Sequence, residues 1–128
     1  ADRIQRYFRE VPDVAWDILD NATSPVTLIL DEANGVAPSL IGEDGSLGIR
    51  VTRDQFSRDI CYRLQKPLVS TSANISGEPA AQNYCDIDSR IIEAVDYVCE
   101  YRRNDTTAHK PSSIIKIDEK ERITIIRA

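Results

Sequence analysis

The sequence predicts an α+β domain with an α/β-like order of elements, in which helices flank a twisted, mixed, open sheet. Two observations support this fold class. Short β-branched segments alternate with segments whose apolar residues recur at helical spacing. The chain also ends in two β-branched segments joined by a polar turn, which is typical of an antiparallel hairpin. With 128 residues and 41% hydrophobic composition, residues 1–128 can bury one core and are expected to form a single domain.

The first half of the chain is expected to form helix, strand, loop, strand and helix in that order. Residues 13–22 predict a helix that Asp13 caps, and residues 26–30 predict a strand because they are apolar and rich in β-branched side chains. A loop that contains glycines and a proline follows. Residues 49–51 predict a short strand, and a helix with an apolar stripe begins at Asp54.

The second half is expected to add one helix and four strands to the domain, the last two strands forming a hairpin. Residues 68–71 predict a buried strand, residues 88–95 a helix and residues 97–99 another strand. The terminal hairpin is expected to pair residues 113–117 with residues 123–127 across a polar turn.

Charge and cysteine content exclude several classes of protein. The net charge is −5, but the segment from Arg50 to Lys66 holds five basic residues against two acidic ones. No apolar run approaches the ~20 residues of a membrane-spanning helix, so no membrane partner is expected. Three cysteines without a C-x-x-C pair favour a reducing cytoplasm and argue against a zinc site.

The densest group of polar side chains follows the strand expected at residues 68–71. Residues 70–77 concentrate hydroxyl groups and a carboxamide, which suit a phosphate or carboxylate ligand, or equally a loop held by side-chain-to-backbone turns. Arg50 either points into solvent or binds a planar anion through two hydrogen bonds. No nucleophile with its base is evident, so the sequence assigns no catalytic residue.

Four stretches, in order, resemble the YrdC/Sua family. Pro67 to Pro79 contains an S-A-N-x-S-G core directly after an expected strand and is similar to the family's signature loop. Residues 25–30 resemble its P-x-T strand, and residues 48–51 resemble its G-x-R-x segment. Residues 111–115, followed by Ile126-Arg127, resemble its P-S-T hairpin and terminal arginine.

The resemblance implies an L-threonylcarbamoyladenylate synthase, a nucleotidyltransferase that uses L-threonine, bicarbonate and ATP with Mg²⁺ in the modification of tRNA. It implies that hydroxyl, amide and guanidinium groups bind the substrates. By position, L-threonine would contact Arg50, Ser72 and Ser112, and ATP would contact Ser46, Asn74 and Arg127.

The chain also departs from the family pattern. The family's domain begins with a strand, a threonine-binding Thr and a basic K-x-R segment, and nothing before Asp13 supplies them. We therefore expect an N-terminally truncated domain, the C-terminal two-thirds, which binds ATP poorly and has little or no activity alone. An open sheet would also expose an apolar edge and favour self-association.

Two alternatives belong to other classes. A double-stranded RNA- or tRNA-binding module without catalysis would use the basic stretch from Arg50 to Lys66, although the net charge of −5 weakens it. The related carbamoyl-transfer domain of hydrogenase maturation proteins would require zinc-finger and acylphosphatase-like regions that are not in this sequence.

Overall fold

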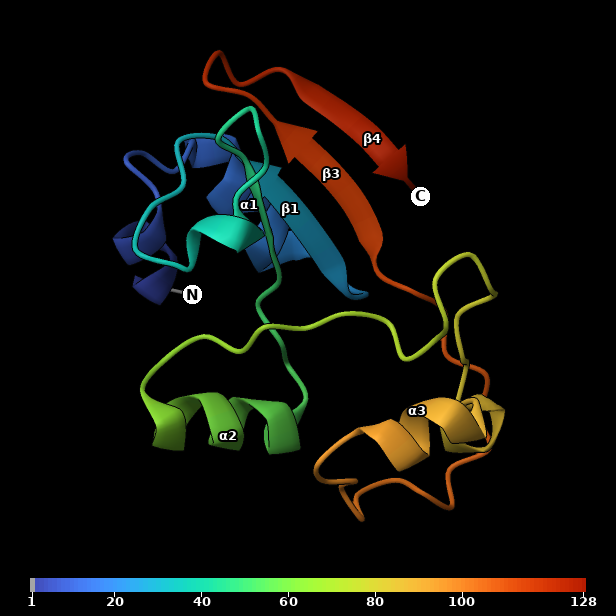
Figure 1. Cartoon of the computed structure of the whole chain (residues 1–128). Helices are drawn as coiled ribbons and strands as arrows, with labels where there is room; N and C mark the ends of the chain where they lie inside the picture. The colour runs from blue at the N-terminus through green and yellow to red at the C-terminus, as the bar shows by residue number, and fades with distance from the viewer. Residues whose placement is uncertain (1) are drawn as a thin grey trace. The chain divides into compact units, whose positions relative to one another are not determined.

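The computed structural model describes residues 2–128 and divides the chain into two compact units (Figure 1). The first unit consists of Ala1–Ile60 and Ser112–Ala128, and the second of Cys61–Pro111. The single domain expected over residues 1–128 stays a prediction. No helix within the described part of the chain is long and apolar enough to cross a membrane.

In residues 2–128 ten helical and strand elements follow one another and end in the terminal hairpin. In chain order they are η1 (Asp2–Tyr7), α1 (Asp13–Asn21), β1 (Val26–Leu30), η2 (Pro38–Leu40), β2 (Leu47–Ile49), α2 (Gln55–Leu64), η3 (Tyr84–Asp86), α3 (Ser89–Ala94), β3 (Ser113–Ile117) and β4 (Ile123–Arg127).

The four strands form one mixed sheet in the order β2-β1-β3-β4, which confirms the α+β class and the mixed open sheet. β1 pairs antiparallel with β2, placing Leu28 opposite Ile49, and parallel with β3, placing Val26 opposite Ser113. β3 and β4 pair antiparallel with an irregularity between Ile114 and Ile115. The terminal hairpin was therefore predicted with its correct strand bounds.

One face of the sheet carries the hydrophobic core of the first unit. β1 alternates buried and half-buried residues, so Leu28 and Leu30 face the core together with Ile117 of β3. α1 covers this face with Ala15 and Leu19, which are both buried. The opposite face, called the outer face below, carries the alternate residues of each strand.

Two expectations about the first unit were wrong in detail. The short strand is Leu47–Ile49, not residues 49–51, because antiparallel pairing with β1 begins at Leu47 opposite Leu30; Arg50 follows the strand instead of lying in it. Helix α1 is preceded by Pro12 at its N-cap, and Asp13 is the first helical residue, so no side chain caps it. The helix expected to begin at Asp54 begins one residue later, at Gln55, and the Asp54 carboxylate accepts from the backbone N–H of Ser57 in its first turn at 2.9 Å.

The second unit contains no strand, so the strands expected at residues 68–71 and 97–99 were wrong. A β-branched segment forms a strand only where another strand offers hydrogen bonds, and the paired strands described here all belong to the first unit. Val69 and Tyr97 are accordingly 74% and 76% exposed. The expected helix is present as α3, shortened to Ser89–Ala94.

Candidate substrate site

A hydrogen-bonded group at one end of the sheet links β1, the residue before β3, and β4. The hydroxyl oxygens of Thr27 and Ser112 lie 2.8 Å apart. The guanidinium of Arg127 donates twice to the Ser112 carbonyl oxygen, from Nε at 2.9 Å and from Nη2 at 2.6 Å. Two of the six residues expected to contact substrate, Ser112 and Arg127, are thus in direct contact.

The backbone fixes Ser112 as well. The amide of Ser113 donates to the Pro25 carbonyl oxygen at 3.1 Å, which joins the start of β3 to the start of β1. Ser112 is therefore held through its side chain, its carbonyl and the following amide. A hydroxyl held this way keeps its direction before any ligand arrives, which lowers the entropic cost of binding.

Arg50 follows β2 at the same end of the sheet. The β1–β2 register ends with Leu28 opposite Ile49, so Thr27 and Arg50 are the residues next to the last pair. Ile49 packs against the core, and Arg50, the next residue, is exposed. Arg50, Thr27, Ser112 and Arg127 thus follow one another across the strand order β2-β1-β3-β4.

A second polar group contains Ser46. Asp44 accepts hydrogen bonds from the Ser46 hydroxyl at 2.6 Å and the Ser46 amide at 3.0 Å, and its other oxygen accepts from Lys116 Nζ at 3.0 Å. These hydrogen bonds, chiefly those from Ser46, hold the pKa of Asp44 well below its usual range. Asp44 in turn raises the pKa of Lys116.

The two polar groups lie at different points along β3. Ser112 precedes the strand and Lys116 is four residues further on, which corresponds to about 13 Å of extended chain. Lys116 is opposite Ile29 in the register with β1, two residues beyond Thr27, and so shares the outer face. This separation suits an extended ligand better than a single small anion.

The loop of residues 67–79, which resembles the family's signature loop, lies in the second unit. The Asn74 side-chain nitrogen donates to the carbonyl oxygens of Ile75 and Glu78, each at 3.0 Å, so both of its hydrogens are used. Its Oδ1 is buried and has no hydrogen-bond partner among residues 2–128. Asn74 therefore both closes the loop, as the structural alternative expected, and retains an acceptor for a donor group.

Ion pairs hold the end of this loop at Glu78 but not Ser72 near its start. Gly77 has φ +84°, a left-handed conformation that favours glycine. Glu78 pairs with Arg90 at 3.1 Å, and Arg90 also contacts Asp88 at 2.7 Å, which lowers the pKa of Asp88 to about 2. Ser72 is exposed, and no hydrogen bond of the described chain uses its hydroxyl.

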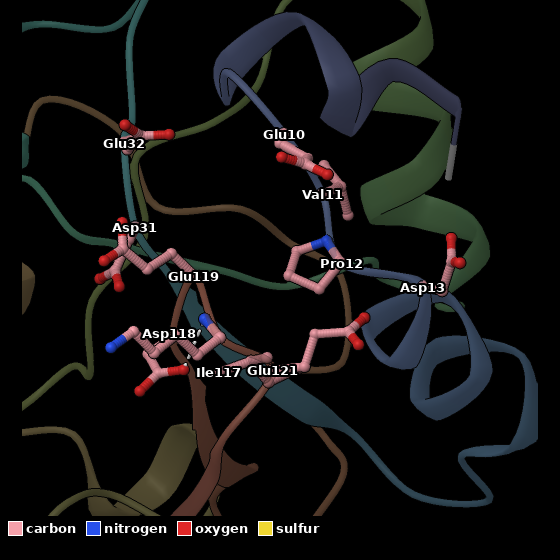
Figure 2. Close-up of a pocket in the computed structure, with 11 residues that line it drawn as sticks. Glu10, Val11, Pro12, Asp13, Asp31, Glu32, Ile117, Asp118, Glu119 and Glu121 are labelled. Atoms are coloured by element: carbon pink, nitrogen blue, oxygen red, sulfur yellow. Dashed lines mark hydrogen bonds between the residues drawn. The ribbon is translucent and has the colours of Figure 1, made fainter.

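A hollow of about 420 Å³ in the first unit has a different chemistry from the outer face. Figure 2 shows carboxylates entering it from the segment before α1, from the end of β1 and from the β3–β4 turn. Lys120 is the one basic residue in its lining, so the hollow repels polyphosphate. Its acidic residues are Glu10, Asp13, Asp31, Glu32, Asp118, Glu119 and Glu121.

Sequence reasoning missed three residues of these groups, namely Thr27, Asp44 and Lys116. Thr27 had a usable signal, because it is a hydroxyl in an apolar strand at a position that alternation turns away from the core. Asp44 and Lys116 had none, since a contact across 72 residues cannot be read from spacing.

Comparison with known proteins accounts for this combination of sheet and loop. The Sua5, YciO and YrdC family model, described as telomere recombination, matches residues 1–128. The chain belongs to this family. A protein of Methanocaldococcus jannaschii, provisionally named a threonylcarbamoyl-AMP synthase, is 34% identical over 97% of this chain and 56% of its own length. The threonylcarbamoyl-AMP synthase of Idiomarina loihiensis is 33% identical over 69% of this chain and 47% of its own.

A solved structure has the same fold. The solution structure of the MTH1692 protein from Methanobacterium thermoautotrophicum matches with a TM-score of 0.64 and 30% identity. The match covers 99% of this chain and 58% of that protein. The chain thus spans about half the length of the relatives it matches.

Proposed function

We propose that this chain carries part of the substrate site, including contacts to L-threonine, of an L-threonylcarbamoyladenylate synthase acting in tRNA modification. The reaction would join L-threonine, bicarbonate and ATP into threonylcarbamoyl-AMP, with release of pyrophosphate and water. The observation that carries the proposal is the row of residues across this end of the sheet. In the strand order, a fixed hydroxyl at Ser112 lies between β2, which Arg50 follows, and β4, which ends at Arg127. Membership in the family and the names of the relatives support the same activity.

The groups of this row suit binding and orientation. A guanidinium binds a carboxylate through two charge-assisted hydrogen bonds, so Arg50 would hold the threonine carboxylate together with Ser112. Ser72 stays a predicted L-threonine contact of the second unit. Ser46, Asn74 and Arg127 would contact ATP. Catalysis would come from placing the threonylcarbamate oxygen in line with the α-phosphorus, with pyrophosphate as the leaving group.

The geometry of Asn74 refines its proposed role. Both hydrogens of its amide are used within the loop, whereas phosphate oxygens only accept hydrogen bonds. Asn74 would therefore accept through Oδ1 from a ribose hydroxyl or an amino group of the nucleotide.

Mg²⁺ would arrive with ATP. Within residues 2–128 no group of three or more potential ligands is placed to hold a metal ion. Magnesium in nucleotide sites keeps several waters and is held by phosphates with one or two carboxylates, so the residues present are compatible with a phosphate-borne ion. When bound, the ion would supply charge neutralisation at the phosphates.

A chimera tests the activity. The segment of the Methanocaldococcus jannaschii relative that this chain does not span is fused to the 128 residues, and pyrophosphate release is measured with all three substrates. We expect threonine-dependent release from the chimera, its loss on Arg50→Ala, and little or no release from the 128 residues alone. A well-folded chimera without release, or one unaffected by Arg50→Ala, would contradict the proposal.

Binding of double-stranded RNA receives less support from the structure. Arg53, one of the five basic residues considered for phosphate contacts, donates from Nη2 to the Leu19 carbonyl oxygen at 3.0 Å. Arg58 and Arg63 are exposed. Salt-dependent RNA affinity that falls on neutralising Arg58 and Arg63 would favour this alternative.

A further inference from the structure

We propose that Thr27 is a positioning residue: its hydroxyl donates to Ser112 Oγ and thereby directs the Ser112 hydrogen toward the carboxylate of L-threonine. The inference rests on the proposed function and adds to it a residue that touches no substrate. Its basis is the 2.8 Å contact between the two hydroxyl oxygens.

The direction of the hydrogen bond follows from counting hydrogens. Each hydroxyl has one hydrogen and can accept two hydrogen bonds. A carboxylate only accepts, so Ser112 can bind it only with its own hydrogen. Ser112 must then accept from Thr27, which leaves Thr27 as the donor of this pair. Successive hydroxyl donors polarise one another, so the second bond is stronger than an isolated one.

The sheet holds Thr27 in the required rotamer. In the strand order, β1 lies between β2 and β3, so the two branches of the Thr27 side chain have different neighbours. The methyl carbon Cγ2 lies beside Gly48 of β2, 3.6 Å from where a β-carbon on that glycine would be, while Oγ1 meets Ser112 on the β3 side. Because a β-branched side chain has restricted χ1 rotation, this arrangement keeps the hydroxyl aimed at Ser112.

Ser112 depends on Thr27 for this direction. Arg127 binds the Ser112 carbonyl and the Ser113 amide binds Pro25, and both contacts fix the backbone but leave the hydroxyl free to rotate. Within residues 2–128, the hydrogen-bond partner of Ser112 Oγ is the hydroxyl of Thr27. Removing it would leave the backbone in place and the hydroxyl undirected.

The test is calorimetric titration of the 128-residue chain and its variants with L-threonine. Thr27→Val replaces the hydroxyl by a methyl group of similar size, and we expect the Kd to rise about tenfold. Thr27→Ser keeps the donor and is expected to restore most of the affinity. Thr124→Val is the matched control, because Thr124 lies in β4 and no side-chain hydrogen bond is found for it in the described chain.

Ser112→Ala distinguishes positioning from a general effect on the sheet. In that background Thr27→Val should cause no further loss of affinity, because the hydroxyl that Thr27 directs is gone. Backbone amide spectra of each variant establish that it folds. If Thr27→Val does not fold, Thr27→Ala takes its place, since alanine fits wherever threonine fits.

The outcomes separate this inference from the proposed function. Equal affinities of Thr27→Val and wild type, with a clear loss in Ser112→Ala, would overturn the role of Thr27 and leave the proposed function standing. Failure of Thr27→Ser to restore affinity would also overturn it. Absence of L-threonine binding by the wild-type chain would contradict the proposed function together with the role of Thr27.

Discussion

Loss of the Arg127 side chain is expected to weaken binding of L-threonine as well as ATP. Arg127 is proposed to contact the nucleotide, yet its Nε and Nη2 both donate to the carbonyl of Ser112, a residue proposed to contact L-threonine. Arg127→Ala removes both bonds, so the backbone at Ser112 gains freedom that threonine binding must then remove.

The size of the effect follows from the contacts. Hydrogen bonds to charged groups contribute ~1.5–3 kcal/mol, and exposure of Arg127 reduces the value to about 1 kcal/mol. The other anchors of this segment, the Ser113 amide and the Thr27 hydroxyl, remain in the variant. We therefore expect Kd for L-threonine to rise about fivefold.

Isothermal titration of the purified chain measures this effect without requiring turnover. Arg122→Ala is the matched control, because this substitution removes the same charge from the same hairpin. Arg122 pairs with Asp118 in the β3–β4 turn at 2.7 Å. Unchanged threonine affinity in Arg127→Ala would refute the reasoning. An equal loss in both variants would attribute the effect to net charge instead.

Three further predictions concern the core and the polar groups. Leu28→Ala, at a fully buried position in a central strand, is expected to lower the free energy of unfolding by about 3 kcal/mol in urea titration; a loss below ~1 kcal/mol would contradict the core described here. Asp44 has a lowered pKa, so it stabilises the fold above its ordinary pKa of about 4 and this stabilisation is lost as pH falls further. Urea titrations below pH 4 should therefore show a smaller acid-induced loss of unfolding free energy in Asp44→Asn than in wild type, and equal losses would argue against the hydrogen bonds that Ser46 and Lys116 donate to Asp44. Asn74→Asp turns a carboxylate oxygen toward two carbonyl oxygens and should lower the free energy of opening the loop by ~1–3 kcal/mol. Amide hydrogen exchange at Glu78 should therefore become faster, and unchanged exchange would exclude the amide orientation of Asn74 in which both hydrogens are donated within the loop.

The sheet was predictable where strands are marked by local sequence. Residues 26–30, 113–117 and 123–127 are β-branched runs bounded by proline or charged turn residues, and the structure has strands with those bounds. β2 was misplaced by two residues because it contains Gly48, a residue type that strand propensity disfavours. Only pairing with β1 shows that Gly48 belongs to the strand.

The second unit shows why local pattern was insufficient elsewhere. Residues 68–71 and 97–99 have strand-like composition, but a strand also requires a partner, and no residue of Cys61–Pro111 is buried or strand-paired. The same limit applies to the candidate site. Thr27 and Ser112 are 85 residues apart, so spacing could not reveal a contact that the parallel pairing of β1 and β3 creates.

The exposed edge of the sheet bears on how the protein behaves in solution. β4 is exposed along its length, with Ile123, Ile125 and Ile126 at 50%, 67% and 56% exposure. An edge strand with free backbone groups and apolar side chains promotes pairing between chains. This feature supports the expectation of self-association and makes a measured oligomeric state a necessary accompaniment to every binding experiment.

The most direct test of the central claim is a nuclear magnetic resonance titration of the isotope-labelled chain with L-threonine. The account predicts saturable amide shifts at Arg50, Thr27, Ser112 and Arg127, with little change at the carboxylate-lined hollow around Asp118. Shifts confined to the hollow, or no saturable shift at these four residues, would contradict the proposed binding of L-threonine.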